Sequence, residues 1–295
     1  MRRVMTLALA LVAPIVFAQA DKSPETTLSW AGCGITQKAF MRSLAEAYEE
    51  KTGVHIDIRG GGATKGIRAS SSQEVDMGGT CRLQLDGEAS EANAYLEPVA
   101  WDALAVIVHK DNPINDISLA QLRALYEGKI SNWSELGGPD APLDLYVRRG
   151  KISGVGRTLR QLVFANYEQE FPSGREFSST GPLEEALESN PNAIGVTGIS
   201  SAQKRDLKIL TLDGKSPNYD NIKSGAYLLY RPLYIVYNPA APSRDEINKF
   251  VQFAQTREGK AIIKENGVVP YTEALSLIMK QLEQERMARD AGLYR

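Results

Sequence analysis

The sequence predicts an α/β fold with mostly parallel strands, and two observations support this. Short apolar runs typical of strands alternate along the chain with segments whose apolar residues recur at helical spacing. Glycine-rich or polar turns separate the two kinds of segment, and three of these turns come directly before a predicted helix. The length of 295 residues suits two domains of modest size.

The expected elements follow one another in that alternating order. Apolar residues recur at helical spacing over residues 36–50, which predicts a helix that ends at Gly53. Residues 54–58 alternate apolar and polar side chains and predict a strand, and residues 60–66 then form a loop before a short helix. The remaining expected elements are strands at 104–108, 144–148, 193–196, 207–212 and 227–236, and helices at 118–126, 158–165 and 272–291.

Residues 1–20 have the composition of an export signal. Arg2 and Arg3 precede an apolar run over residues 5–17, and Ala18-Gln19-Ala20 matches the small-residue pattern of a cleavage site. The run is shorter than a membrane span, and no cysteine follows it that could carry a lipid. We therefore expect cleavage after residue 20 and a soluble protein outside the cytoplasm. The alternative is an uncleaved N-terminal anchor.

Charge and motif content exclude several classes of function. Without its first twenty residues the chain has 34 − 2 = 32 basic residues against 36 acidic ones, so its net charge is −4. This balance argues against general binding of nucleic acid or anionic membranes. His55 and His109 have no partner at metal-ligand spacing, and no phosphate-loop or serine-nucleophile motif is present. We expect no metal ion and no cofactor.

Three turns combine glycine, a hydroxyl residue and the start of a helix. They lie at residues 32–37, 62–65 and 148–157, and the second and third add basic side chains. The free N–H groups and the positive end of a helix dipole favour an anion at such a turn. Each turn alone could be an ordinary helix cap, and the third could be a solvated charged loop. Together they predict a site for a small anion.

Several segments resemble the phosphate-binding proteins of ABC transporters. They include AGCGITQKAF, IRGGGATKGI, VDMGGTCR and VRRGKISGVGRT, and the resemblance extends in order through nearly the whole mature chain. It implies a type II periplasmic-binding-protein fold, in which two α/β lobes are joined by two crossing strands and enclose the ligand in a cleft. Lobe 1 would comprise residues 21–106 and 226–295, and lobe 2 residues 107–225.

The resemblance also implies the ligand contacts. Its second-lobe arginine falls on Arg149, with Arg148 as the alternative. Val155 stands where the family has a threonine, and Cys81 where it has a carboxylate or a serine, so the identity of the anion stays open. The residues assigned to the anion are Ile35, Thr36, Gln37, Thr64, Lys65, Arg82, Arg149, Ser153, Gly154, Val155 and Arg157.

The sequence has two cysteines, Cys33 and Cys81, and the resemblance places both at anion-site turns. We expect a disulfide between them, which would close a loop of 81 − 33 − 1 = 47 residues. A loop of this size corresponds to roughly 4 kcal/mol of stabilisation in the chain-entropy model. The alternatives are two unconnected buried thiols, or a reactive thiol pair for redox chemistry or soft-metal binding.

These observations predict a monomeric periplasmic binding protein rather than an enzyme. It would capture a small phosphate-like oxyanion and pass it to the membrane permease of an ABC transporter. Two alternatives stay open: a sensory or adhesion module of the same fold, and a phosphatase-like or thiol-redox enzyme. The terminal helix is expected to pack on lobe 1 through the apolar residues Leu275, Ile278, Met279 and Leu282.

Overall fold

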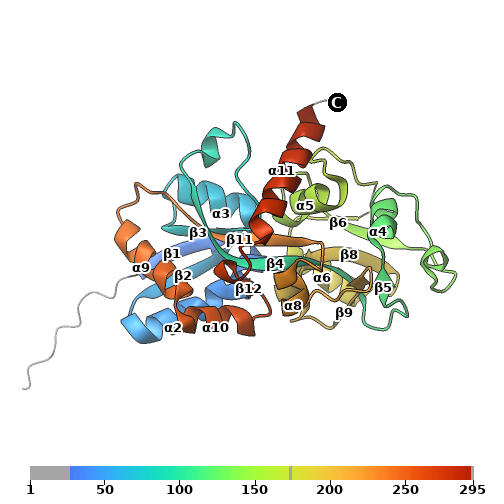
Figure 1. The fold of residues 1–295 in the computed structure, drawn as a ribbon, viewed down its shortest axis with the longest axis horizontal. Helices are drawn as coiled ribbons and strands as arrows, with labels where there is room; N and C mark the ends of the chain where they lie inside the picture. The colour runs from blue at the N-terminus through green and yellow to red at the C-terminus, as the bar shows by residue number, and fades with distance from the viewer. Residues whose placement is uncertain (1–26, 173–174, 294–295) are drawn as a thin grey trace, which may run out of the picture.

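Ten strands form one curled sheet that runs through both halves of the molecule (Figure 1), and two short strands form a separate sheet. The computed structural model describes residues 27–172 and 175–293, so the predicted export signal lies outside the described residues. The sheet order is β2-β1-β3-β11-β4-β8-β6-β7, and β9 and β12 also pair with β4. Helices cover both faces of the sheet, as the sequence pattern predicted.

Two long strands cross between the halves. β4 (Tyr95–His109) pairs antiparallel with β11 (Tyr230–Tyr237) as far as Ala103, and with β8 (Ala193–Gly198) from Leu104 onward. Because one strand serves two sheets in succession, it joins two lobes through continuous backbone. The predicted two-lobed α/β fold is therefore confirmed.

Lobe 1 is built on parallel strands that follow the predicted pattern. β1 (Thr27–Gly32) lies between β2 (His55–Gly60) and β3 (Met77–Thr80), with both neighbours parallel to it. The remaining elements of this lobe are α1 (Gly34–Thr36), η1 (Gln37–Met41), α2 (Arg42–Thr52), α3 (Gly62–Ser71), η2 (Ala89–Glu91), α9 (Arg244–Gln255), α10 (Arg257–Glu265), β12 (Val269–Pro270) and η5 (Tyr271–Glu273).

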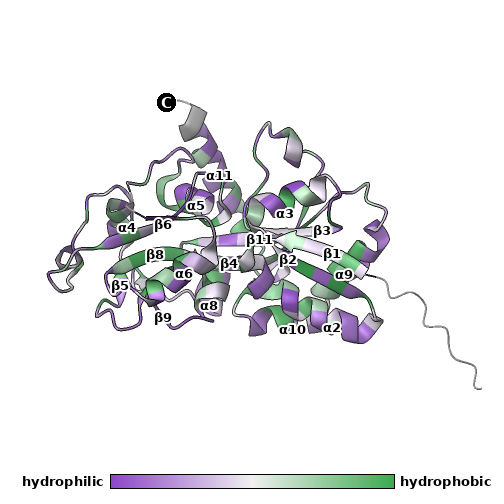
Figure 2. Cartoon of the chain, turned by 180° about the vertical axis from the view of Figure 1, so that it is seen from behind, coloured by the Kyte–Doolittle hydropathy of each residue, from purple (hydrophilic) through white to green (hydrophobic). Residues whose placement is uncertain are grey.

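Lobe 2 has a second parallel group, β8-β6-β7. β6 (Asp144–Arg148) lies between β8 and β7 (Arg175–Phe177), and its bounds match the predicted strand. Figure 2 shows hydrophobic residues along β8, which is buried throughout its length. The other elements are β5 (Asp116–Ile117), α4 (Leu119–Tyr126), η3 (Trp133–Leu136), α5 (Gly154–Leu159), η4 (Arg160–Phe164), α6 (Thr180–Glu188), α7 (Ile199–Ala202), β9 (Leu207–Ile209), β10 (Thr211–Leu212) and α8 (Tyr219–Ser224).

Two local details matter for the site. The segment predicted as a loop at residues 60–66 is shorter, because α3 already begins at Gly62 and includes Thr64 and Lys65 in its first turn. Gly61 makes this early start possible, since its φ of 152° is a conformation that residues with a Cβ rarely adopt. The helix predicted at 158–165 likewise begins earlier, at Gly154.

The terminal helix differs from its prediction. α11 (Leu277–Leu293) lies across the seam between the lobes, next to α3 and α5 (Figure 1). Gln281 Nε2 donates to Tyr234 of lobe 1 at 3.3 Å, while the Ala288 carbonyl accepts from the Tyr167 N–H of lobe 2 at 3.5 Å. The helix therefore contacts both lobes and not lobe 1 alone.

The face that α11 buries was predicted correctly only at Ile278, which is partly buried and packs against the core. Leu275 (just before the helix), Met279 and Leu282 are exposed, whereas Gln281 and Glu285 are buried. The seam between the lobes is lined with polar groups, so the polar side of the helix faces inward there. No helix in the described ranges is long and apolar enough to cross a membrane.

Candidate anion site between the lobes

The first predicted turn is the start of a long helix at the end of β1. Cys33 caps this helix: its Sγ accepts from the Thr36 N–H at 3.3 Å, and its own N–H donates to the Gly79 carbonyl at 3.0 Å. The helix continues without a break through α1, η1 and α2 to Thr52. Its positive end therefore points at the seam from lobe 1, with Ile35 and Thr36 fully buried beside it.

Cys81 lies beside Cys33, because β1 and β3 are parallel neighbours with Gly32 opposite Gly79. The cysteines are 5% and 2% exposed, and each thiol shifts the pKa of the other. Both are free thiols, so the predicted disulfide is not found in the structure, although the predicted proximity is. The Cys33 sulfur instead caps the helix at Thr36.

The two thiols differ in acidity. Burial raises the pKa of Cys33, but hydrogen bonds from Cys81 and Thr36 and the charge of Arg231 outweigh it and lower the pKa to about 6. The hydrogen bond to Cys33, together with burial, holds the pKa of Cys81 well above its usual range. Cys33 is therefore the more acidic of the two thiols.

A buried ion pair connects the two crossing strands next to the cysteines. Arg231 on β11 lies opposite Asp102 on β4, and its Nε and Nη2 donate to Asp102 Oδ2 at 3.3 and 3.1 Å. Burial tends to lower the pKa of Arg231, but the negative charges of Cys81, Asp102 and Cys33 raise it. Nη1 of Arg231 is buried and has no hydrogen-bond partner among the described residues.

Sequence reasoning missed Arg231. The residue stands inside a predicted apolar strand, and nothing in the turn motifs points to it. A charged residue within an otherwise apolar run was the available signal, because a buried guanidinium needs either an ion pair or a ligand.

The start of α5 in lobe 2 lies against the cluster formed by Cys33, Cys81, Asp102 and Arg231. Ser153 caps the helix through its Oγ, which accepts from the Gly156 N–H at 3.3 Å. Gly154 packs directly on Cys81: a Cβ at this position would lie well inside 3.0 Å of the Cys81 sulfur. Thr158 Oγ1 also donates to the Cys81 carbonyl at 3.2 Å. The lobes are therefore in contact here, and a second helix start faces the cysteines.

The start of α7 completes the enclosure. A Cβ on Gly198 would lie 2.7 Å from Ile35 Cγ2 and 2.8 Å from Asp102 Oδ2, so this glycine lets β8 approach lobe 1. The Ser200 hydroxyl, one residue into α7, is fully buried and has no partner among the described residues. Together with Arg231 Nη1, it is a second polar group near Asp102 that a ligand could satisfy.

The structure favours Arg148 over Arg149 as the second-lobe arginine. The Arg149 side chain is 67% exposed, and its ion-pair partner is Glu176 on the surface, at 3.7 Å. Arg148 is half-buried, and its Nη1 donates to Thr180 Oγ1 at 2.8 Å. Burial lowers the pKa of Arg148, while the charges of Cys81 and Cys33 act in the opposite direction, which places its guanidinium in the field of the cysteines.

Arg82 is buried, and all of its side-chain N–H groups are hydrogen-bonded within the protein. Its Nε donates to the Ile152 carbonyl of lobe 2 at 3.0 Å, and its Nη1 and Nη2 hold both oxygens of Glu91 at 2.9 and 2.7 Å. The two remaining N–H groups go to the Leu83 carbonyl at 2.7 Å and to the Thr64 hydroxyl at 3.2 Å. Because a guanidinium has five N–H donors, none is left for an anion. The predicted contact Arg82 thus joins the lobes through the Ile152 carbonyl, and the predicted contact Thr64 accepts one of its other N–H groups within lobe 1.

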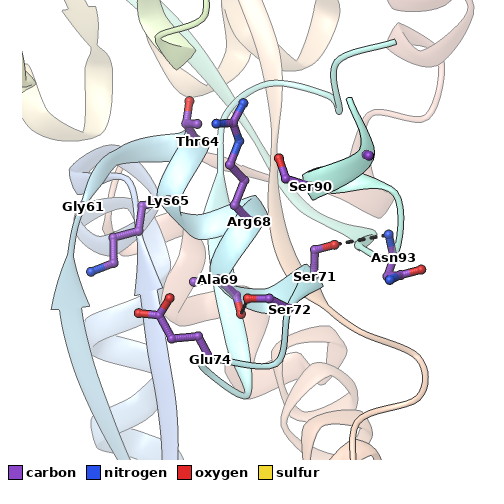
Figure 3. Close-up of a pocket in the computed structure, with 11 residues that line it drawn as sticks. Gly61, Thr64, Lys65, Arg68, Ala69, Ser71, Ser72, Glu74, Ser90 and Asn93 are labelled. Atoms are coloured by element: carbon purple, nitrogen blue, oxygen red, sulfur yellow. Dashed lines mark hydrogen bonds between the residues drawn. The ribbon is translucent and has the colours of Figure 1, made fainter. Parts of the chain in front are cut away.

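Two further predicted contacts lie away from the cluster. Lys65 is exposed and lines an open groove of about 710 Å³ on the outside of lobe 1, between α3 and η2 (Figure 3). The Arg157 guanidinium stacks on the ring of Tyr167, 3.6 Å from its centroid. The remaining predicted residues belong to the two helix starts, and their role in binding stays a prediction: Ile35, Thr36, Gln37, Ser153, Gly154 and Val155.

The described residues contain no group of three or more His, Cys, Asp or Glu side chains that could hold a metal ion. His55 lies on the surface beside Glu49, 2.9 Å away, and His109 lies 3.7 Å from Asp111. The contact region between the lobes therefore offers two helix starts, the pair of thiols of Cys33 and Cys81 (the dithiol), and Arg231, whose Nη1 has no hydrogen-bond partner among the described residues. Such a set suits hydrogen bonding to an oxyanion.

Comparison with known proteins agrees with this geometry. The chain is 25% identical over 260 residues to the phosphate-binding protein PstS of Bacillus subtilis, covering 87% of this chain and 84% of the relative. It is 24% identical over 276 residues to PstS of Borreliella burgdorferi, covering 90% of this chain and 98% of the relative.

Solved structures give the same result. A putative phosphate ABC transporter substrate-binding protein from Clostridium perfringens, with bound phosphate, superimposes with a TM-score of 0.74 at 27% identity, covering 83% of this chain and 99% of that one. An ABC-type phosphate transport receptor from Vibrio cholerae gives 0.63 at 25% identity, covering 82% and 99%. The PBP superfamily domain matches residues 21–258, and the chain belongs to this superfamily.

Proposed function

We propose that this chain is the substrate-binding protein of an ABC-type importer and captures a small, phosphate-like oxyanion between its lobes. The observation that carries the proposal is Arg231, whose Nη1 is buried and unpartnered beside the helix starts at Cys33 and Gly154. An unpaired buried donor costs about 1–3 kcal/mol, and an anion that accepts from it recovers that cost. Relatives of this chain are named as phosphate-binding proteins.

The rest of the proposal concerns where the protein works and with what. Residues 1–20 would direct export and be removed, so that a monomeric protein binds its ligand in the periplasm. The permease of the transporter would receive the ligand when the lobes separate. We propose binding without catalysis, since the site has no nucleophile aligned with a general base at a position for attack on an ester.

Thermal unfolding with a panel of oxyanions tests this function. Phosphate, arsenate and sulfate would each be added to the mature protein, and a ligand at 100 times its dissociation constant should stabilise it by about 2.7 kcal/mol. At least one oxyanion should raise the unfolding midpoint. If none does at millimolar concentration, oxyanion capture is wrong.

Two arginine variants test which side chain holds the anion. Arg231→Gln removes a charged donor from the site and should weaken binding about 10- to 150-fold, because hydrogen bonds from charged groups contribute about 1.5–3 kcal/mol. Arg149→Gln is the matched control and should bind normally, since Arg149 lies on the surface. Calorimetric titration measures the affinity of both glutamine variants. Arg231→Lys keeps the positive charge beside Asp102 and is the control for folding. Equal weakening in the two glutamine variants would contradict the assignment.

A further inference from the structure

The dithiol is the feature of the seam that oxyanion capture does not explain. Neither thiol is needed to hold the chain together, because both are free, and neither lies on the surface. Sulfur is a weak hydrogen-bond partner, so two thiols contribute little to a phosphate-like ligand. Yet Cys33 and Cys81 stand at the point where the helix start of lobe 2 closes on lobe 1, with Gly154 packed against Cys81.

Two neighbouring thiols are a strong ligand set for soft elements, and Cys33 is the more acidic of the two. The charges around them decide which soft element fits. Arg231 is buried beside the pair, Arg148 lies in its field, and two helix starts point at it. This positive surrounding disfavours a metal cation and favours a neutral or anionic oxygen compound.

We propose that the interlobe site binds a thiophilic oxyacid, in which trivalent arsenic or antimony bonds to both Cys33 and Cys81. The inference rests on the proposed function and names its ligand class, since it needs the same oxyanion-type cleft between the lobes. The sulfurs recognise the central atom, and the surrounding donors recognise its oxygen. A pentavalent oxyanion such as phosphate uses only the second of these two kinds of contact.

The binding step is an exchange without oxidation or reduction. An uncharged trihydroxide of the element meets the two thiols, and two element–oxygen bonds break as two element–sulfur bonds form. The two hydroxyls leave as two molecules of water, which take one proton from the Cys81 thiol and the other from the Cys33 thiol or, where Cys33 is ionised, from solvent. One hydroxyl stays on the central atom, and Arg231 Nη1 and the Ser200 hydroxyl are the unpartnered groups available to it.

Lobe 2 then covers the ligand that is bound to the two cysteines of lobe 1. Both sulfurs belong to lobe 1, so capture does not require closure, whereas Gly154 and the Thr158 hydroxyl reach Cys81 only when the lobes meet. Water must enter to reverse the exchange, and the closed lobes keep it out. Opening by a permease would allow the ligand to leave.

The test uses the reduced mature protein, with arsenite as the probe. Calorimetry should give one arsenite per chain, and the number of thiols that react with a chromogenic disulfide should fall from two to zero in the unfolded, arsenite-treated protein. Cys33→Ser and Cys81→Ser should each weaken arsenite binding by about tenfold or more. With one thiol left, the arsenic forms a single sulfur bond and the favourable intramolecular second bond is lost. Arg149→Gln is the matched control and should bind like the wild-type chain, and circular dichroism should show that all three variants are folded.

Four outcomes decide between these possibilities. Arsenite binding that needs both cysteines and is lost when they are oxidised to a disulfide supports the proposal. If phosphate binds and arsenite does not, the thiophilic ligand is wrong while the proposed function stands. If neither binds, both proposals fail, and arsenite binding that survives in Cys33→Ser also overturns the role of the dithiol.

Discussion

Adding one methyl group at Gly154 should prevent the lobes from closing. In Gly154→Ala the new Cβ would lie well inside 3.0 Å of the Cys81 sulfur and 3.1 Å from the Ala63 Cβ. Neither neighbour is the far end of a flexible side chain: Cys81 is fixed at the end of β3, and Ala63 lies in α3. The overlap is therefore relieved most easily by moving α5 and the rest of lobe 2 away.

The size of the effect follows from the contacts that closure makes. Overpacking of a tight contact costs about 1–3 kcal/mol, which corresponds to about a 5- to 150-fold loss of affinity if it falls entirely on the closed state. Moving α5 away also breaks hydrogen bonds between the lobes, among them those from Arg82 Nε to the Ile152 carbonyl and from Thr158 Oγ1 to the Cys81 carbonyl. The change affects one contact between the lobes and removes no buried side chain, so unfolding of the ligand-free protein should change less than ligand binding.

Calorimetric titration with the ligand found in the oxyanion panel, and small-angle scattering of the bound protein, measure the two consequences. Gly154→Ala should bind more weakly and should remain more extended with ligand present. The matched control is Gly60→Ala, because a Cβ there meets no atom within 4 Å and the residue has no positive φ. Unchanged affinity in Gly154→Ala would refute the view that the structure represents the ligand-holding arrangement of the lobes.

Two further predictions concern stability. Burial tends to raise the pKa of Glu91, but hydrogen bonds from Arg82 and the Leu85 N–H hold it below its usual range. Its contribution is therefore complete above the ordinary glutamate pKa of about 4.3 and is lost as the pH falls through the lowered value. Urea unfolding between pH 7 and pH 3 should show this loss in the wild type, and Glu91→Gln should cost about 3–5 kcal/mol at pH 7 and flatten the profile; an equally steep profile in the variant would contradict it. In α11, Leu277→Ala should lower the free energy of unfolding by about 2–5 kcal/mol because Leu277 is buried, whereas Leu282→Ala should lower it by less than about 0.5 kcal/mol because Leu282 is exposed. Urea unfolding measures both changes, and equal losses would contradict the orientation of α11 in the structure.

Much of the fold could be predicted from the sequence because local rules and tertiary structure agree there. Ser118 caps α4 in a capping box with Gln121, as the serine before an apolar helix indicates. The strand at Asp144–Arg148 was predicted to the residue, since its apolar core and its flanking polar residues leave little choice of register. The turns at Cys33 and Ser153 do lie along one seam, because parallel strands bring their carboxyl ends together.

The features that the sequence did not predict correctly depend on contacts between segments that are distant along the chain. Arg148 and Arg149 are adjacent and chemically identical, and only the direction of β6 as it reaches the seam decides which one faces the cysteines. The inward face of α11 is polar because it covers a polar seam, so hydrophobic spacing indicated the wrong side. Arg231 lies on a strand whose apolar neighbours concealed its role.

Counting hydrogen-bond donors separates three arginines near the seam into different roles. Arg82 uses all five N–H groups on protein acceptors, one of them in the opposite lobe, so it contributes to closure whether or not a ligand is present. Arg148 is held by backbone and hydroxyl oxygens of its own lobe. Arg231 keeps an unpaired donor in a buried position, and an unpaired charged donor is costly there. Thr158 and Gln161 of lobe 2 line the same small cavity as Arg231, so an oxygen acceptor that pairs with this donor would favour the closed arrangement of the lobes.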